Sequence, residues 1–220
     1  MIGPILLVAA ILATTPAVVE AQAKKVLPVD EAAHDPEFFA FRARLLVALQ
    51  QRDLQFLYGI VADDIRNSFG GDGGIDGFKA RWKPEDASSE LWKTLTQVLA
   101  LGGQFAAREG TNTFVAPYVF TVETGADPFE NWVIIGDAVR VRAQPDEASP
   151  ILARLSFDVV RVTGSKATPG PGRHAWMPVQ LADGRTGWVA SEFIRSPVDY
   201  RAIFARRAGR WLLEALIAGD

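Results

Sequence analysis

Two arginines alternate with two valines in the segment Val139–Arg142. In an extended strand successive side chains point to opposite faces, so we expect Arg140 and Arg142 on one face and the valines on the core face. A guanidinium group binds a carboxylate through two parallel hydrogen bonds. The pattern therefore fits two structures: a site that binds a peptide carboxylate, and an ordinary solvated strand face.

Three aromatic residues, Trp176, Trp188 and Phe193, follow in the same strand-rich part of the chain. Trp188 comes shortly after the pair Asp183-Gly184, which is typical of a tight hairpin turn. Aromatic side chains at such positions serve either as the wall of a peptide groove or as core residues. Together with the two arginines, these three aromatic residues are the candidate ligand-binding set.

Residues that could carry out catalysis are few and scattered. The two histidines are His34, in a polar stretch, and His174, at the end of a loop-like segment, and neither has a neighbouring partner for general-base or zinc chemistry. The sequence has no Gly-x-Ser-x-Gly motif, and no carboxylate pair stands out as an acid and base couple. We therefore expect a protein that is not an enzyme, with no catalytic residue and no cofactor.

A glycine-rich run, Gly70–Gly74, lies near Asp63, Asp64, Asp72 and Asp76. Their spacing does not match a helix–loop–helix calcium site, which needs further oxygen ligands and a late bidentate glutamate. The run also lacks the Gly-Lys-Ser/Thr ending of a phosphate-binding loop. A turn followed by a helix cap explains these residues, so no metal site is expected.

Composition narrows the class of protein. With 49% hydrophobic and 22% charged residues, the 220-residue chain is typical of a folded protein. Its formal net charge of −3 creates no positive electrostatic potential that would attract phosphate groups, so nucleic acid is not expected as a partner. Cysteine is absent, which excludes disulfides, thiolate nucleophiles and cysteine-ligated metals.

Residues 1–23 have the pattern of a signal peptide. The apolar run from Ile5 to Ala13 is too short to span a bilayer, and Ala21-Gln22-Ala23 supplies the small residues that a signal peptidase requires. The alternative is an uncleaved N-terminal anchor, because no lysine or arginine precedes the apolar run. No later stretch is a transmembrane candidate, so we expect a periplasmic or secreted protein with no stable membrane insertion after cleavage.

The N-terminal third is predicted to be helical after a loose linker at residues 24–34. Asp35-Pro36 is typical of a helix start, and apolar residues follow at helical spacing. Asp53 is expected to cap a second helix, whose buried stripe runs through residues 54–65. A later helix is expected to begin at Pro84 and to end at a pair of glycines.

From Thr111 the pattern changes to short strands. Phe114–Val122 is β-rich, and its proline indicates a sheet edge or a bulge. Short strands separated by turns then occupy residues 130–197, which is typical of a small barrel, with a mobile loop expected at Thr163–Arg173. The C-terminal hairpin, residues 200–217, needs another sheet partner, for which Phe114–Val122 is the candidate.

Several short phrases between Trp132 and Pro197 resemble the bacterial SH3 (SH3b) family. They occur in the family's order and include its Val-Arg-x-x-Pro and Gly-Trp-Val elements, as Ala138–Pro145, Leu155–Val160, Trp176–Val179 and Asp183–Val189. The chain departs from the family at Ser156, where a glycine is usual, and in its long Thr163–Arg173 segment. The flanking segments look like parts of an NTF2-like α+β domain.

The resemblance implies an extracytoplasmic binding module, directed at peptidoglycan peptides or at protein partners, whose barrel has no catalytic activity. We therefore predict an α+β fold with an SH3-like β-barrel inserted into a helical N-terminal part that a small antiparallel sheet completes. The predicted divisions are a signal peptide, a linker, a discontinuous α+β domain and an SH3b-like barrel, at residues 1–23, 24–34, 35–125 plus 198–220, and 130–197.

The leading functional hypothesis is an exported, non-enzymatic protein whose barrel binds a cell-wall peptide or an envelope protein. A second hypothesis places a small-ligand pocket or a weak hydrolase in the helical domain, in a cavity lined by Phe38, Tyr58, Trp82 and Tyr118. A third is an inhibitor or scaffold that docks one partner protein. The sequence leaves the ligand and the oligomeric state open.

Overall fold

The computed structural model describes residues 24–71, 73–108, 111–125 and 127–219. The predicted signal peptide lies outside this part of the chain. Of the helices within the described ranges, none has both the length and the apolarity needed to cross a bilayer.

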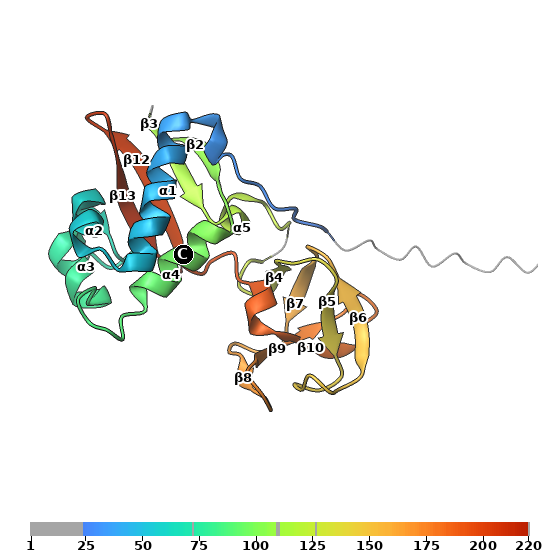
Figure 1. Ribbon diagram of the computed structural model, residues 1–220. Helices are drawn as coiled ribbons and strands as arrows, with labels where there is room; N and C mark the ends of the chain where they lie inside the picture. The colour runs from blue at the N-terminus through green and yellow to red at the C-terminus, as the bar shows by residue number, and fades with distance from the viewer. Residues whose placement is uncertain (1–23, 72, 109–110, 126, 220) are drawn as a thin grey trace, which may run out of the picture.

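The described chain forms two units, each built around its own sheet (Figure 1). The helix–sheet unit comprises residues 32–121 and 201–217, and the strand unit comprises residues 131–195. The fold is therefore of the mixed α+β class, as the sequence predicted.

The helices precede most of the strands in the chain. In the helix–sheet unit they are η1 (Ala32–His34), α1 (Pro36–Gln51), α2 (Leu54–Ile60), α3 (Gly74–Trp82), α4 (Leu91–Ala100) and α5 (Tyr118–Thr121). The predicted start of α1 is confirmed, because Asp35 Oδ1 accepts hydrogen bonds from the backbone N–H groups of Glu37, at 2.9 Å, and Phe38, at 3.0 Å. These contacts satisfy donors that the first turn of a helix leaves free.

The predicted second helix is too long. It ends at Ile60, and the rest of its apolar stripe forms strand β1 (Val61–Arg66), which pairs parallel to β13 (Arg210–Ile217) with Val61 opposite Leu213. Val61 and Ile65 are buried, as a helical stripe would also require. Both residues are β-branched and suit a strand once a partner strand is present, so tertiary pairing decides the outcome. The prediction of a purely antiparallel sheet is therefore wrong.

The sheet of the helix–sheet unit has the strand order β1-β13-β12-β3-β2. Its remaining strands are β2 (Gln104–Arg108), β3 (Thr111–Ala116) and β12 (Arg201–Arg207). The core lies between this sheet and the helices, with Phe38 of α1 at its centre. The Phe38 ring lies 4.2 Å from the Phe114 ring and 4.8 Å from the Trp211 ring, measured between centroids.

The predicted strand Phe114–Val122 is shorter than expected. Strand β3 ends at Ala116, the Ala116–Pro117 peptide bond is cis, and Tyr118–Thr121 forms the short helix α5 instead. Proline has no N–H to donate, so the strand ladder stops there. The expected pairing with the C-terminal hairpin is present in the shortened strand, where Phe114 of β3 lies opposite Phe204 of β12.

The strand unit has the strand order β11-β4-β7-β9-β10-β5-β6. The strands are β4 (Asn131–Ile134), β5 (Val139–Arg142), β6 (Ile151–Leu155), β7 (Val159–Val162), β9 (Ala175–Gln180), β10 (Thr186–Ala190) and β11 (Ile194–Arg195). Among the described residues the pairing does not join β6 to β11, so the sheet does not close as a barrel would. Its core is aliphatic, with Val141, Val179 and Val189 fully buried.

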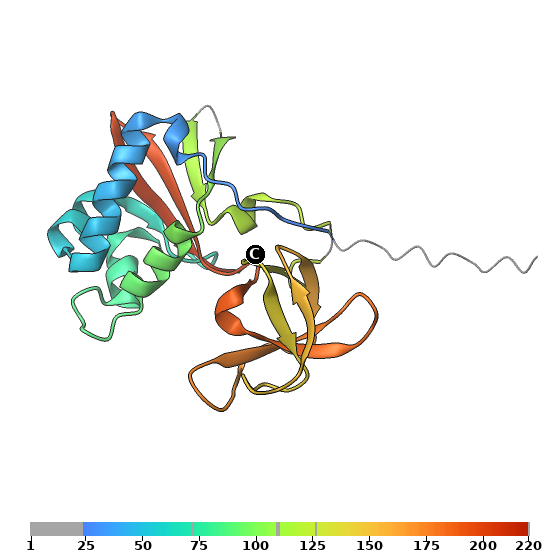
Figure 2. The ribbon, with the colours of Figure 1, turned by 45° about the vertical axis from the view of Figure 1, so that its right-hand side comes forward.

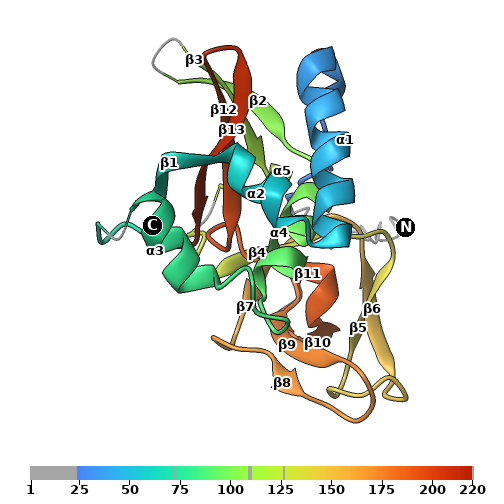
Figure 3. The same cartoon turned by 60° about the vertical axis from the view of Figure 1, so that its left-hand side comes forward.

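The segment Thr163–Arg173, predicted as a mobile loop, contains the short strand β8 (Thr168–Pro169), which pairs with β9. Figure 3 shows β8 at the end of the strand unit that lies away from the helices. Gly170 follows β8, and a Cβ atom on it would lie 2.2 Å from the Pro145 carbonyl oxygen and 2.5 Å from Trp176 Nε1. Only glycine permits this close approach of the segment to Trp176.

Residues 24–34 are not the loose linker that the sequence predicted. At one end, Val26 N–H donates to the Phe157 carbonyl at 2.7 Å, and Val159 N–H donates to the Lys24 carbonyl at 2.8 Å. At the other end, Arg42 of α1 holds Asp30 through two hydrogen bonds of 2.7 Å. This segment, the N-terminal strap, therefore joins the strand unit to the helix–sheet unit (Figure 2).

Candidate ligand-binding site

A pocket of about 530 Å³ opens on the strand unit. Strands β5 and β6, strand β9, the β5–β6 loop and the short helix η2 (Ser191–Phe193) contribute its walls. The side chains that define its chemistry are Asp137, Arg140, Arg142, Glu147, Arg154, Arg173, His174, Trp176 and Phe193. Four of the five residues predicted to bind a ligand are in this set, and Trp188 is not.

Arg140 and Arg154 lie directly opposite each other on β5 and β6. Both side chains are exposed, and neither forms an ion pair or hydrogen bond with another described residue. Like charges that face each other across a strand pair repel and destabilise it. The two guanidinium groups therefore place two uncompensated positive charges at the rim of the pocket.

Arg142 lines the same pocket but is only 9% exposed. Its Nη1 donates to the Ser149 carbonyl at 2.7 Å, and the Ser149 hydroxyl accepts a hydrogen bond of 2.9 Å from the Gln144 N–H. The guanidinium group thus fixes the β5–β6 loop at the edge of the pocket. Because of this contact, the Nη1 donor of Arg142 is already occupied and is not free to bind a ligand carboxylate.

Trp176 and Phe193 form the aromatic part of the lining. Trp176 is 2% exposed, and its Nε1 has no hydrogen-bond acceptor within the described part of the chain. Phe193 is 44% exposed, which is high for a large apolar side chain. Trp188 is half-buried on β10, opposite Arg142 and Pro178, outside the pocket lining.

His174, which the sequence suggested was without partners, lies between two glutamates. Its Nε2 is 3.0 Å from Glu147 Oε1, and its Nδ1 contacts Glu192 Oε1. Arg173 Nε lies 3.2 Å from the same Nε2 atom, and the imidazole meets the Trp176 ring edge-on with centroids 5.9 Å apart. This cluster could not be predicted from the sequence, because the two glutamates come from the β5–β6 loop and η2, which are distant from His174 along the chain.

In the described ranges, no group of histidine, aspartate or glutamate residues could hold a metal ion. Asp64, part of the aspartate cluster noted in the sequence, instead forms an ion pair with Arg207 at 2.8 Å. Asp76 lies in the first turn of α3, where a carboxylate interacts favourably with the helix dipole. In the ligand pocket, basic side chains outnumber acidic ones, so its chemistry favours an anionic group.

The cavity predicted in the helical domain does not form, because its four residues do not converge. Phe38 and Trp82 are packed into the core of the helix–sheet unit, and Tyr118 belongs to a separate cluster between the two units. Tyr58 reaches the surface, where its hydroxyl donates to Glu85. Partial burial and this hydrogen bond raise the pKa of Tyr58 to about 12.

Residues 137–195 match the family model of the bacterial SH3 domain. The chain contains a bacterial SH3 domain. Neither the curated proteins nor the solved structures include a match to the chain. The family match covers every charged and aromatic residue of the pocket, so the candidate site belongs to the SH3 domain itself. Bacterial SH3 domains are binding modules that commonly recognise peptidoglycan or proteins.

Proposed function

We propose that this is an exported, non-enzymatic binding protein of the periplasm, or a secreted one, whose SH3 domain binds a carboxylate of a cell-wall peptide. The SH3 match supports a binding role, and the signal-like pattern of residues 1–23 supports export. The pocket supplies the two features that a short acidic peptide needs, a pair of guanidinium groups and an aromatic surface.

The observation that carries the proposal is the cross-strand pair Arg140 and Arg154. Two other exposed arginines of the strand unit have carboxylate partners: Arg161 pairs with Glu130 and Arg185 with Asp183, at 2.9 and 2.6 Å. The pair at the pocket has none among the described residues, and its repulsion is relieved when a ligand carboxylate binds between the guanidinium groups. The exposed ring of Phe193 then contacts the apolar part of the peptide.

The strand order supports an SH3 domain that is inserted into the helix–sheet unit. Strand β3 precedes it and pairs with β12, which follows it, so the chain leaves and re-enters one sheet around the insertion. The N-terminal strap adds a third connection. Three attachments fix the orientation of the pocket, which lowers the entropy lost when an extended ligand such as a cell-wall strand binds.

Co-sedimentation with purified peptidoglycan tests this function. The wild-type protein is expected to sediment with the wall material, and Arg140→Gln together with Arg154→Gln is expected to abolish sedimentation. Arg185→Gln, an exposed arginine of the same domain outside the pocket, is the matched control and should sediment like the wild type.

The same variants, immobilised and exposed to an envelope extract, separate the two partner classes. Retention of one envelope protein by wild type and by Arg185→Gln, without any binding to peptidoglycan, would replace the cell-wall proposal with docking to a protein. Equal sedimentation of all variants would show that Arg140 and Arg154 do not contribute to binding.

A further inference from the structure

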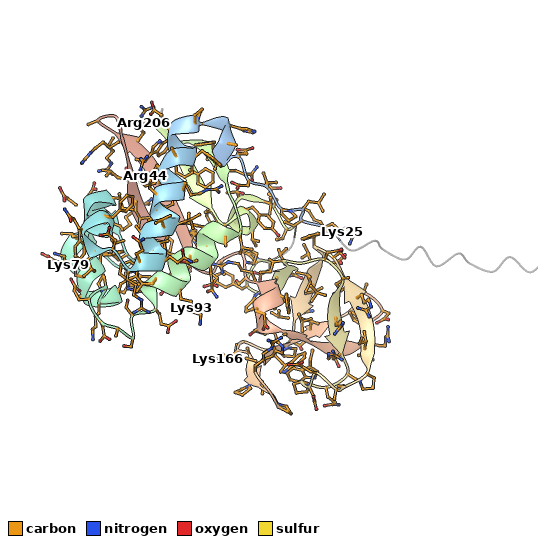
Figure 4. All side chains as sticks on the ribbon, in the orientation of Figure 1. Lys25, Arg44, Lys79, Lys93, Lys166 and Arg206 are labelled. Carbon is orange, nitrogen blue, oxygen red and sulfur yellow. The ribbon has the colours of Figure 1, made fainter. Side chains whose placement is uncertain are left out.

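A second groove, of about 640 Å³, lies on the helix–sheet unit and is separate from the SH3 pocket. Helices α1 and α2 form one wall, and the turn end of the β12–β13 hairpin forms the other. Figure 4 shows Arg44 and Arg206, two of its lining residues, on the helix–sheet unit at a distance from Lys166 of the strand unit. The two sites can therefore be tested independently.

The inner surface of this groove is apolar. Phe41, Ile60 and Trp211 are buried, and Phe56 and Leu212 are half-buried beside them. Gly59, another lining residue, is exposed, and a Cβ atom on it would have no neighbour within 4 Å. A larger side chain at this position would therefore meet no steric conflict within the protein.

Trp211, one of the lining residues, has a buried indole N–H without a partner among the described residues. Trp211 is only 5% exposed, yet its Nε1–H has no hydrogen-bond acceptor within the described part of the chain. Buried indole N–H groups usually find an acceptor, since leaving one unpaired is unfavourable. The Trp211 indole N–H is therefore a probe of changes at the groove.

The rim of the groove is basic. On the same hairpin, Arg206 pairs with Glu37, and Arg207 pairs with Asp64 and Glu214. In contrast, Arg44 and Arg210 line the groove, are exposed and form no ion pair or hydrogen bond with the described residues. The groove therefore has two uncompensated guanidinium groups beside an apolar surface, a combination that is complementary to an amphipathic anion.

We propose that this groove binds a monocarboxylate with an apolar chain, of the fatty-acid type. The carboxylate meets the guanidinium groups of Arg44 and Arg210, and the chain lies along the half-buried side chains of Phe56 and Leu212, which are the accessible part of the apolar lining. The site is distinct from the peptide site of the SH3 domain and does not depend on it.

Titration with decanoate, followed by the indole N–H resonances in ¹H–¹⁵N NMR spectra, tests the proposal. A Trp211→Phe variant assigns the Trp211 resonance among the six tryptophans. Decanoate is expected to shift this resonance with saturation, whereas acetate, which has no chain, and decan-1-ol, which has no charge, bind about tenfold more weakly or not at all. Gly59→Leu, which adds a bulky side chain to the groove wall, should weaken binding.

Variants at the rim complete the test. Arg44→Gln and Arg210→Gln are each expected to weaken decanoate binding about tenfold, while Lys93→Gln, an exposed lysine of the same unit outside the groove, leaves it unchanged. The SH3 variant Arg154→Gln should also bind decanoate normally, so failure of one site does not imply failure of the other. Equal binding of decanoate and decan-1-ol, or no movement of the Trp211 resonance, would overturn the proposal.

Discussion

The arginines of the strand unit differ in the acceptors to which their N–H groups donate hydrogen bonds. Arg142 donates to a backbone carbonyl and fixes a loop, whereas Arg140, two residues earlier on the same strand, has no partner among the described residues. Both were predicted from one alternating pattern. Their roles diverge because the β5–β6 loop folds back over Arg142 and leaves Arg140 exposed.

This difference predicts effects of different size on stability. Arg142→Gln leaves the buried Ser149 carbonyl without its donor and should lower the free energy of unfolding by about 1–3 kcal/mol. Arg140→Gln removes an exposed charge that faces another arginine and should change it by less than about 0.5 kcal/mol. Urea unfolding of both variants measures the effects, and similar losses in the two would contradict the assigned roles.

Tyr118 provides a pH-dependent test. Burial raises its pKa from 10.0 to about 12, and its hydroxyl has no partner within the described residues. The folded state therefore holds the proton more tightly than the unfolded state, so the contribution of this group to stability is complete below pH 10 and is lost as the pH rises through 12.

In Tyr118→Phe this loss should be absent, and the stability at neutral pH should equal or exceed that of the wild type because an unpaired hydroxyl is removed. Tyr58, whose pKa is also raised, stays in both proteins, so their difference isolates Tyr118. Thermal unfolding of both proteins over about pH 8–11 measures this difference in the pH dependence of stability. A steeper decline in the variant than in the wild type would contradict this assignment.

Part of the candidate site was predictable because it depends on local pattern. Strand alternation predicted that Arg140 would be exposed, and the family phrases identified the segment that carries Trp176. Arg154, Glu147 and His174 were missed, because cross-strand register and loop closure bring them to the pocket from separate segments. No spacing rule in one sequence encodes these contacts.

Among the helices and strands, too, features set by neighbouring residues were predictable and features set by distant segments were not. The start of α1 was predicted because its cap is local: Asp35 binds N–H groups two and three residues later. Strand β1 was taken for helix and the N-terminal strap for a loose linker, because both depend on partners more than a hundred residues away. Polar composition in residues 24–34 reflects ion pairs to other elements and not solvation alone.

The backbone hydrogen bonds of the N-terminal strap predict that two amides exchange their hydrogens slowly. The N–H groups of Val26 and Val159 donate to carbonyls across the strap at 2.7 and 2.8 Å, so their hydrogen exchange should be slowed strongly relative to an unstructured peptide. Val26 is also 4% exposed, which limits access of water to this contact. Exchange of the Val26 amide at the rate of a free chain, measured by NMR, would show that the strap is not formed in solution.

At the scale of the whole molecule, the two units share a third apolar cluster. Its buried members come from the strap, α5 and β4: Val26, Tyr118, Val119 and Val133. In Figure 4, Lys25 marks the point where the strap meets the strand unit, and its Nζ lies 2.9 Å from the buried Asp158 carboxylate. The cluster and this ion pair couple the SH3 domain to its host.

This coupling predicts a single cooperative unfolding transition. Val133→Ala removes two buried methyl groups from the shared cluster and should lower the free energy of unfolding by about 1–3 kcal/mol. The unfolding midpoint should fall for the helices and for the SH3 domain together. Far-UV circular dichroism follows the helices, and NMR signals of the SH3 strands follow the insertion. Two separated transitions, with only one of them shifted, would contradict the coupling.

Recognition of a carboxylate through Arg140 and Arg154 of the SH3 pocket can be measured by calorimetric titration. The ligands are a cell-wall stem peptide that ends in a free carboxylate and the same peptide as its carboxamide. The carboxamide and the Arg154→Gln variant are each expected to weaken binding about tenfold, while Arg185→Gln has no effect. Equal affinity for the two peptides, unchanged by Arg154→Gln, would contradict this mode of recognition.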